Sequence, residues 1–383
     1  MRLRVPGPTP VPARVLLAGA NQVVYHRSPA FKALLTETAS LLQPLFGTTG
    51  TPIVLSSSGT GGLEAALANT LREGDKVLVL NNGHWGQRFG RLATNLGANV
   101  ETIDSPWGSG ADVHALEQRL TAPDANDFVA ILVAHNDTFT GAVSDLASIG
   151  SVVRDHPAVL IVDAVSSLGS MPIETDLWGL DIVVSASQKG LMSPPGLAMV
   201  AVSDKAWRRI ESVNLRGEYW NLFTARRMSE KGETPFTPAV NVIFALNEAL
   251  KMVHESGIAE TFARQANLGE ALAAGAAVLE MNRFPNPEVA SPSVSVLRTP
   301  DNVDANQVVA LMKAQFGTLI AGARHSSLDG SVIRIGTMGY CQPDDIRLDI
   351  YQLAHVLTKL GQQIDGPAAL ESTERILQVG HIS

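Results

Sequence analysis

The sequence contains almost no cysteine, and no class of residue is unusually abundant. Its 383 residues include one cysteine, Cys341, so no disulfide can form within the chain. This favours a reducing compartment, and we expect a cytoplasmic protein. Hydrophobic residues make up 45% and charged residues 17% of the chain, which is the balance of an ordinary soluble globular protein.

The sequence also lacks an excess of positive charge and a long apolar run. The formal net charge is −8, which gives no electrostatic reason to bind nucleic acid or an anionic membrane surface. No stretch approaches the ~18 apolar residues that a membrane-spanning helix needs. The N-terminus, MRLRVPGPTPVPARV, has prolines where a signal peptide needs an apolar core. We therefore expect neither nucleic acid nor a membrane as partner.

The length and the order of the apolar runs indicate an α/β protein with two domains. At roughly 150 residues per domain, 383 residues suffice for two sizeable cores. Strands and crossover segments alternate from about residue 50 to 205, which predicts a mostly parallel sheet. Ala-rich helices and short alternating strands follow. We expect an N-terminal arm over 1–20, a large domain over 21–257 and a smaller α+β domain over 258–383.

The N-terminal arm is rich in proline, with four between Pro6 and Pro12. Proline fixes φ and removes a backbone donor, so we expect an extended arm over residues 1–20, without a helix or a central strand. A disordered terminus is the alternative interpretation.

Two apolar runs near the middle of the chain end in groups that carry chemistry. Val159–Val162 is followed by Asp163, and Ile182–Val184 leads to Lys189 a few residues later. Both runs are typical of buried strands, and α/β sheets bind ligands outside the carboxyl ends of their strands. One cofactor chemistry needs both groups, because a lysine forms a Schiff base with an aldehyde and an aspartate holds a pyridine nitrogen protonated.

A second pattern predicts an anion site. The apolar run Ile53–Leu55 leads into Ser56–Gly62, a turn of small residues that opens a helical stretch. Unpaired backbone N–H groups and the helix dipole converge at such a turn, and glycine lets an anion approach. The pattern is neither a dinucleotide fingerprint, because position 64 is Glu64, nor a P-loop, because no Gly-Lys-Ser/Thr follows. A plain strand-to-helix turn is the alternative.

Three further features carry weaker signals. Trp85 lies in a glycine-flanked turn after the predicted strand Lys76–Leu80, where it can stack on a flat ring or pack in the core. His135–Asp137 contains metal-ligating residue types, but no second ligand cluster has the right spacing, so no metal is expected. Arg334 stands among apolar residues and needs an anionic partner, either a structural carboxylate or a ligand.

The motifs D-A-V-S-S-L-G, beginning at Asp163, and S-x-S-Q-K-x-L-x-x-P-P-G, around Lys189, resemble those of class V pyridoxal-phosphate (PLP) aminotransferases. The nearest group is the alanine–glyoxylate and serine–pyruvate aminotransferases, and the resemblance covers nearly the whole chain. It implies PLP fold type I, with a mostly parallel sheet of the seven-stranded type between helices and a smaller C-terminal domain.

The resemblance also implies roles for individual residues. Asp163 becomes the partner of the pyridinium nitrogen and Lys189 the Schiff-base lysine. The other expected contacts are the phosphate cup of Ser58, Gly59 and Thr60, the ring-stacking Trp85, the cofactor-binding Thr138 and Gln188, the substrate-carboxylate ligand Arg334, and Thr237, which binds the phosphate of the neighbouring subunit in a homodimer.

The chain departs from the family pattern at one motif. Where the family usually shows Glu-Thr/Ser-Ser-Thr-Gly, this sequence has Asp137 and Phe139 on either side of Thr138. Thr138 still matches the hydroxyl that contacts the cofactor. The shape of the pocket near the substrate is left open.

The implied function is a ping-pong transamination from a small L-amino acid, alanine or serine, to a 2-oxo acid, glyoxylate or pyruvate. Arg334 indicates an α-carboxylate but not the side chain of the donor. No second arginine is clearly placed for a dicarboxylate, so aspartate or an aminophosphonate remains an alternative donor. The arginines considered for that role are Arg27, Arg88, Arg226 and Arg227.

Two other kinds of function remain open. A PLP-dependent lyase or cysteine desulfurase could use the same fold, but desulfurases place histidine before the lysine, where this chain has Gln188. They also use a cysteine ahead of the carboxylate-binding arginine, whereas Cys341 follows Arg334. A non-catalytic scaffold is the least favoured, because such a protein needs neither Lys189 nor Asp163.

Overall fold

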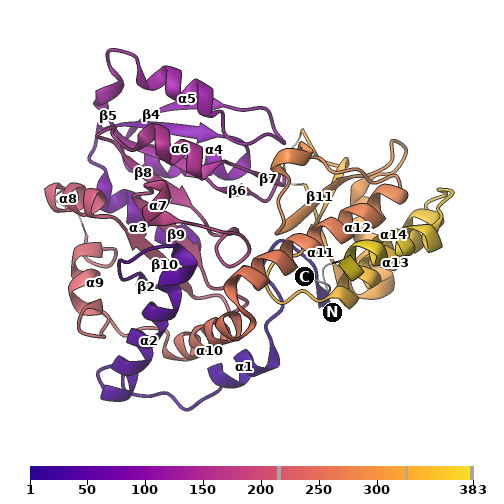
Figure 1. The fold of residues 1–383 in the computed structure, drawn as a ribbon, viewed down its shortest axis with the longest axis horizontal. Coiled ribbons are helices and arrows are strands. Elements are labelled where there is room, and N and C mark those ends of the chain that lie inside the picture. The colour runs from indigo at the N-terminus through magenta and orange to yellow at the C-terminus, as the bar shows by residue number, and fades with distance from the viewer. Residues whose placement is uncertain (214–216, 324, 326, 380–383) are drawn as a thin grey trace.

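The computed structural model describes residues 1–213, 217–323, 325 and 327–379. It has two lobes, with the larger one built around a seven-stranded sheet and the smaller one around a three-stranded sheet (Figure 1). No helix in these residues is both long and apolar enough to cross a membrane.

The seven-stranded sheet is mostly parallel, as predicted. Its strand order is β2-β10-β9-β8-β5-β3-β4, and β10 alone runs antiparallel to its neighbours. The interior strands β3, β5, β8 and β9 are nearly continuous apolar runs because helices cover both faces. The strands are β2 (Ile53–Ser56), β3 (Lys76–Asn81), β4 (Asn99–Asp104), β5 (Phe128–Ala134), β8 (Val159–Asp163), β9 (Ile182–Ala186) and β10 (Leu197–Val202).

Each face of this sheet has its own apolar core. One core joins the sheet to α3 (Gly59–Thr70), α4 (His84–Asn95), α8 (Asp204–Ser212) and α9 (Leu222–Ser229). The other joins it to α2 (Pro29–Phe46), α5 (Val113–Leu120), α6 (Leu146–Val153) and α10 (Val240–Ser256). The short α7 (Thr175–Trp178) and the 3-10 turn η1 (Ala125–Asp127) lie in connections. This three-layer arrangement confirms the predicted fold class.

The smaller lobe is α+β. Its antiparallel sheet has the order β11-β14-β13, and four helices pack around it. The elements are β11 (Val294–Arg298), β13 (Ala321–Gly322), β14 (Val332–Gly336), α11 (Ile258–Val278), α12 (Ala305–Phe316), α13 (Pro343–Lys359), α14 (Gly366–Val379) and the turn η2 (Pro287–Val289). The domain limits at 257 and 258 stay a prediction, and residues 380–383 of that domain lie outside the described part.

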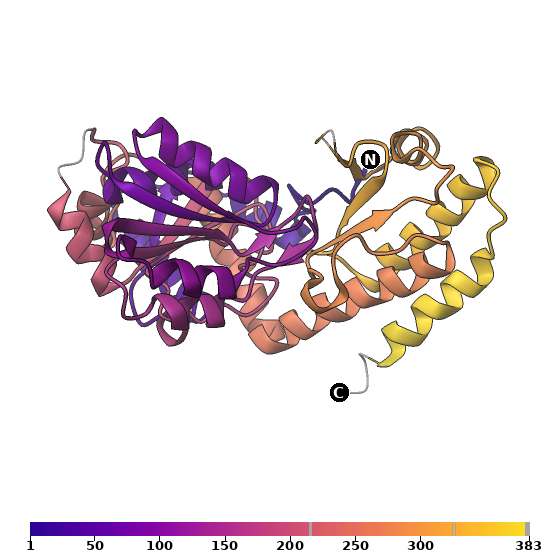
Figure 2. The ribbon, with the colours of Figure 1, turned by 90° about the horizontal axis from the view of Figure 1, so that it is seen from above.

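The N-terminal arm links the two lobes. Strand β1 (Arg2–Leu3) pairs in parallel with β12 (Thr318–Leu319) of the smaller lobe, and the arm then crosses to the larger lobe (Figure 2). The prediction of a fully extended arm is wrong for Ala13–Gly19, which forms helix α1. The prolines end at Pro12, so nothing breaks a helix beyond it, and burial of Val15 against α10 stabilises the helix.

Candidate active site

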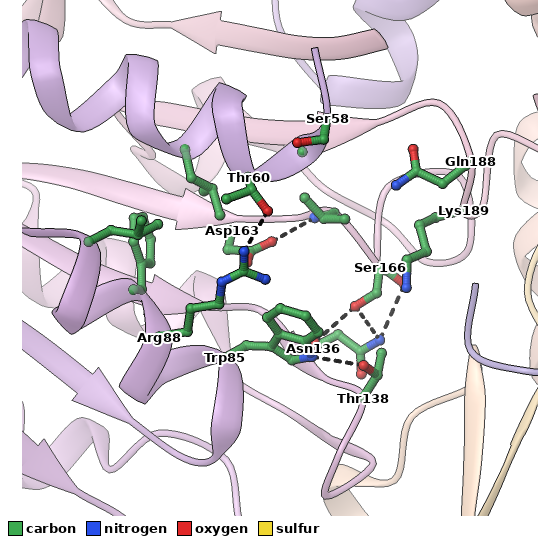
Figure 3. A pocket seen from close by; sticks show the side chains of 15 residues that line it. Ser58, Thr60, Trp85, Arg88, Asn136, Thr138, Asp163, Ser166, Gln188 and Lys189 are labelled. Atoms are coloured by element: carbon green, nitrogen blue, oxygen red, sulfur yellow. Dashed lines mark hydrogen bonds between the residues drawn. The ribbon is translucent and has the colours of Figure 1, made fainter. Parts of the chain in front are cut away.

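The cavity at the carboxyl ends of the parallel strands holds most of the predicted site residues. It lies where β8 ends at Asp163 and the chain after β9 reaches Lys189 (Figure 3). The predicted residues that line it are Ser58, Gly59, Thr60, Trp85, Thr138, Asp163, Gln188 and Lys189. A wider, adjoining cavity contains Arg334 and is also lined by Lys189, Trp85 and Thr138.

Asp163 is almost fully buried at the end of its strand. Its Oδ1 accepts a hydrogen bond of 2.9 Å from the backbone N–H of Val165. Burial raises the pKa of Asp163 from 3.8 to about 6, and the hydrogen bond and the Lys189 amine oppose that rise. Because a buried carboxylate lacks water, it gains most from a cationic hydrogen-bond donor placed beside it.

Lys189 points into the cavity, and its amine donates to the carbonyl oxygen of Pro6 in the N-terminal arm. Burial lowers the pKa of Lys189 from 10.5 to about 8, while Asp163 opposes this effect. A sizeable fraction of the amine is therefore neutral near physiological pH. The neutral amine is the form that attacks a carbonyl carbon.

The predicted anion cup lies at the start of α3. Ser58 is the N-cap, and its Oγ accepts a hydrogen bond of 3.4 Å from the N–H of Gly61. Gly59 lies so close to Val165 that a Cβ there would stand 2.7 Å from a valine methyl group. Thr60 Oγ1 accepts a hydrogen bond of 2.9 Å from Arg88 Nη2. The helix N-terminus and the guanidinium both favour an anion here.

Arg88 was considered in the sequence only as a candidate ligand for a dicarboxylate substrate. In the structure it reaches the cup, and its Cζ lies 5.3 Å from the centre of the Trp85 ring. The two residues are three positions apart in α4, so they share one face of the helix. This spacing would have indicated their proximity if a helix had been expected here.

The segment at Trp85 is helical, so its interpretation as a turn is wrong. Gly83 precedes α4 and offers no side-chain cap, but the buried Asp137 supplies one from the short strand β6 (Asn136–Asp137), which follows β5. Asp137 Oδ2 accepts from the N–H of Trp85 at 2.7 Å, and Oδ1 accepts from Phe139 N–H at 2.8 Å. The carboxylate thereby fixes the Trp85 indole, whose Nε1 donates to Thr138 Oγ1 at 2.8 Å.

Arg334 lies on β14 of the smaller lobe and faces the larger one. Its Nε and Nη2 donate to the carbonyl of Gly322 at 3.0 and 2.9 Å, and Nη1 donates to the carbonyl of Thr138 at 3.1 Å. Its Cζ stands 4.0 Å from the centre of the Phe139 ring. The guanidinium thus lies at the junction of the lobes, in the cavity that also contains Lys189.

Two predicted features lie away from these cavities. Thr237 is exposed and lines a separate surface hollow with Ser56 and Tyr219, so its contact with a neighbouring subunit stays a prediction. At His135–Asp137, the Asn136 amide donates to the hydroxyls of Ser166 and Ser293. Among the residues that the structure describes, no group of three or more His, Cys, Asp or Glu side chains could hold a metal ion.

The whole-chain comparisons agree with this geometry. A family model described as aminotransferase class V matches residues 5–348. The chain belongs to the class V aminotransferase family. This class V aminotransferase is 37% identical to the soluble hydrogenase 42 kDa subunit of Anabaena cylindrica, over 95% of this chain and 94% of the relative.

Two further relatives carry aminotransferase names. The serine–glyoxylate aminotransferase of Methylorubrum extorquens is 35% identical over 88% of this chain and 86% of the relative. The crystal structure of an alanine–glyoxylate aminotransferase from Nostoc sp. has a TM-score of 0.88, with 31% identity over 93% of this chain and 94% of that one. The three names differ, so the comparisons establish the family and leave the substrates open.

The cofactor of a class V aminotransferase is pyridoxal phosphate, and the cavity of this one fits it. The anion cup at Ser58 suits a phosphate, and the buried Asp163 suits a protonated ring nitrogen. Gln188 Oε1 is buried at the cavity wall without a hydrogen-bond partner among the described residues. Such an oxygen is costly unless a ligand supplies a donor.

Proposed function

We propose that this class V aminotransferase transfers the amino group of a small L-amino acid, alanine or serine, to glyoxylate or pyruvate by a ping-pong mechanism. One observation supports this function above the others. The Lys189 amine and the Arg334 guanidinium line one cavity, from opposite lobes, beside the buried Asp163. An amine that handles protons and a fork for a carboxylate are what an α-amino acid substrate requires.

Each group has a defined task in the proposal. When bound, PLP supplies an aldehyde that condenses with amines and a ring that accepts electrons. Asp163 Oδ holds a proton on the ring nitrogen. Lys189 Nζ would take the proton from the substrate Cα and hand it on as general acid, a role that typically accelerates such reactions ~10²–10⁴-fold. Arg334 binds the α-carboxylate with its planar fork.

The remaining residues orient the cofactor. Trp85 offers its flat ring for stacking, and Thr138 and Gln188 offer polar contacts at the cavity wall. The phosphate fits the cup of Ser58, Gly59 and Thr60, with Arg88 adding a positive charge beside it.

The arrangement around Cys341 disfavours a desulfurase. The thiol is fully buried, and Arg4 Nη1 donates to its Sγ at 3.1 Å. Burial raises the pKa of the Cys341 thiol. Cys341 lines neither cavity that contains Lys189, so it is badly placed to receive sulfur from a substrate. An aspartate or aminophosphonate donor is kept as the second candidate, since Arg88 brings further positive charge to the site.

We place the enzyme in the cytoplasm, supported by the free thiol at Cys341. We also propose a homodimer in which Thr237 completes the phosphate site of the neighbouring subunit. The exposed position of Thr237 beside the exposed Tyr219 and Phe236 is compatible with a subunit contact.

The visible absorption spectrum of the PLP-loaded protein tests the function. Single amino acids are added without any 2-oxo acid, and conversion of the lysine-bound cofactor to its amine form is recorded. Conversion by L-alanine or L-serine is the expected result and ranks the two donors. A cofactor absorption band that no amino acid converts would contradict transamination. If Lys189→Ala keeps the band of the lysine-bound cofactor, the proposed role of Lys189 is wrong.

A further inference from the structure

Phe139 is held between an imidazole and a guanidinium at the mouth of the site. The rings of His84 and Phe139 are stacked, with centroids 4.1 Å apart and an angle of 23° between the planes. Arg334 Cζ stands 4.0 Å from the centre of the same phenyl ring. All three side chains line the cavity that also contains Lys189.

The backbone holds this stack in place. Phe139 lies in the hairpin between β6 (Asn136–Asp137) and β7 (Ala142–Val143), and its N–H is bound by Asp137. His84 is the first residue of α4, the helix that the same Asp137 carboxylate caps. One carboxylate therefore positions both aromatic partners. Phe139 is 7% exposed, so Arg334 faces a largely desolvated aromatic residue, and cation–π attraction is strongest where water is excluded.

The polar edge of the His84 ring is available to a ligand. Neither ring nitrogen forms a hydrogen bond with a residue among 1–213, 217–323, 325 and 327–379. Burial lowers the pKa of His84, and Arg91, Arg88, Arg334 and His325 lower it further. The imidazole is consequently neutral at pH 7 and carries one N–H donor and one acceptor nitrogen.

Several positively charged groups surround this position. Arg334 is the proposed fork for the α-carboxylate, Arg88 donates to Thr60 in the phosphate cup, and Arg91 is exposed to solvent. A small substrate side chain beside His84 would meet a neutral ring and the phenyl face of Phe139. A hydroxyl can both donate to and accept from an imidazole.

We propose that His84 is a specificity-determining residue that hydrogen-bonds the β-hydroxyl of a serine-type amino donor, and that Phe139 positions both His84 and Arg334. The inference rests on the proposed function and narrows the preferred donor to 3-hydroxy amino acids, ahead of alanine. His84 acts on the choice of donor and takes no part in the proton transfer, which belongs to Lys189.

The variant His84→Phe tests the recognition step, because it keeps a ring for stacking and removes both nitrogens. Donor-driven conversion of the cofactor is measured on the PLP-loaded enzyme to give kcat/KM for L-serine, L-alanine and L-aspartate. We expect the serine-to-alanine ratio to fall roughly tenfold, the effect of one lost hydrogen bond, with alanine itself nearly unchanged. His114→Phe, on an exposed position of α5, is the control.

The results of this experiment distinguish an error in the role of His84 from an error in the proposed transaminase function. An unchanged serine-to-alanine ratio in His84→Phe overturns the inference while transamination stands. A wild-type enzyme that prefers aspartate overturns it as well. If the wild-type enzyme converts none of these donors, the proposed transaminase function itself is wrong.

A second variant tests the role of Phe139. Phe139→Leu keeps much of the volume and removes the aromatic face beneath Arg334, so KM should rise several-fold for serine and alanine alike while kcat stays close to normal. Phe128→Leu is a matched control, because Arg119 covers that ring at the opposite end of β5, 4.5 Å from its centre. An unchanged KM in Phe139→Leu would show that the ring does not position Arg334.

Discussion

Asp163 and Lys189 lie in one cavity, and burial moves their pKa values toward each other, to about 6 and about 8. In each case burial disfavours the charged form, so the cofactor-free protein carries this pair at a cost in folding free energy. In the proposed site, PLP would remove that cost, because it would engage the amine and give the carboxylate a cationic partner.

The cost of burying Lys189 predicts a pH dependence of stability. The unfolded chain holds this proton up to pH 10.5 and the folded chain only up to about pH 8, so the free energy of unfolding rises as pH increases through that window. Between pH 8 and pH 10.5, the free energy of unfolding of the cofactor-free wild type should rise by up to about 3 kcal/mol relative to that of Lys189→Met. Urea unfolding of both proteins at several pH values measures this, and parallel pH profiles would contradict it.

The role of Asp163 predicts a loss that does not depend on the donor. Asp163→Asn keeps the shape of the side chain and removes its charge, so the ring nitrogen is no longer held protonated. Turnover should fall on the order of 10²-fold with every amino acid, while PLP stays bound. Steady-state rates with alanine and serine test this, and near-normal turnover would show that the assignment is wrong.

Individual site residues could be predicted where a local pattern placed them. Asp163 and Lys189 follow buried strands, and parallel strands bring their carboxyl ends to one edge. The positions of Arg88 and His84 in the cavities could not be predicted, because the start of α4 depends on a cap from Asp137, which is distant in the sequence. Helix starts are usually recognised from a local capping residue, and Gly83 gives no such signal.

The N-terminal arm forms part of the wall of the cavity that contains Lys189. Thr9 N–H donates to the Gln188 carbonyl at 3.1 Å, and the Lys189 amine donates to Pro6. A Cβ at Gly7 would lie 2.6–2.7 Å from the outer atoms of the Lys189 side chain. Such a separation is too short for non-bonded atoms, so any other residue at position 7 must displace the arm or the lysine.

Gly7→Ala should therefore disable the enzyme without unfolding it. A displacement of about 1 Å at Lys189 is expected to lower turnover on the order of 10²-fold. Gly74→Ala is the matched control, since Gly74 also has a positive φ, of +86°, but a Cβ added there would meet no described atom within 4 Å. Turnover and the thermal melting temperature are measured for both variants. Equal losses of turnover in Gly7→Ala and Gly74→Ala would show that backbone strain alone causes the loss.

The sheet was easier to predict than the arm. The runs Phe128–Ala134 and Val159–Val162 are too short and too apolar for a surface helix, so a buried strand was the consistent interpretation. The arm depends on partners that no local pattern reveals. Its first residues pair with β12, and α1 forms because α10 buries Val15.

The whole molecule is proposed to be a dimer with shared sites, and two inactive variants can test this. Lys189→Ala lacks the amine, and Thr237→Glu should repel the phosphate of the neighbouring subunit. If each site takes Thr237 from the partner, mixed dimers contain one intact site, and co-expression restores about a quarter of wild-type activity. If Thr237 serves its own subunit, the mixture stays inactive.

The pairing of the arm with the far end of the sequence also has a consequence for the order of assembly on the ribosome. Arg2 and Leu3 need Thr318 and Leu319, and Arg4 forms a buried ion pair of 2.7 Å with Asp349. These contacts cannot form until nearly the whole chain has been synthesised, whereas the strands between Ile53 and Val202 emerge early. The wall that Pro6 and Gly7 build beside Lys189 is then completed late, so the earliest residues to be made are among the last to fold.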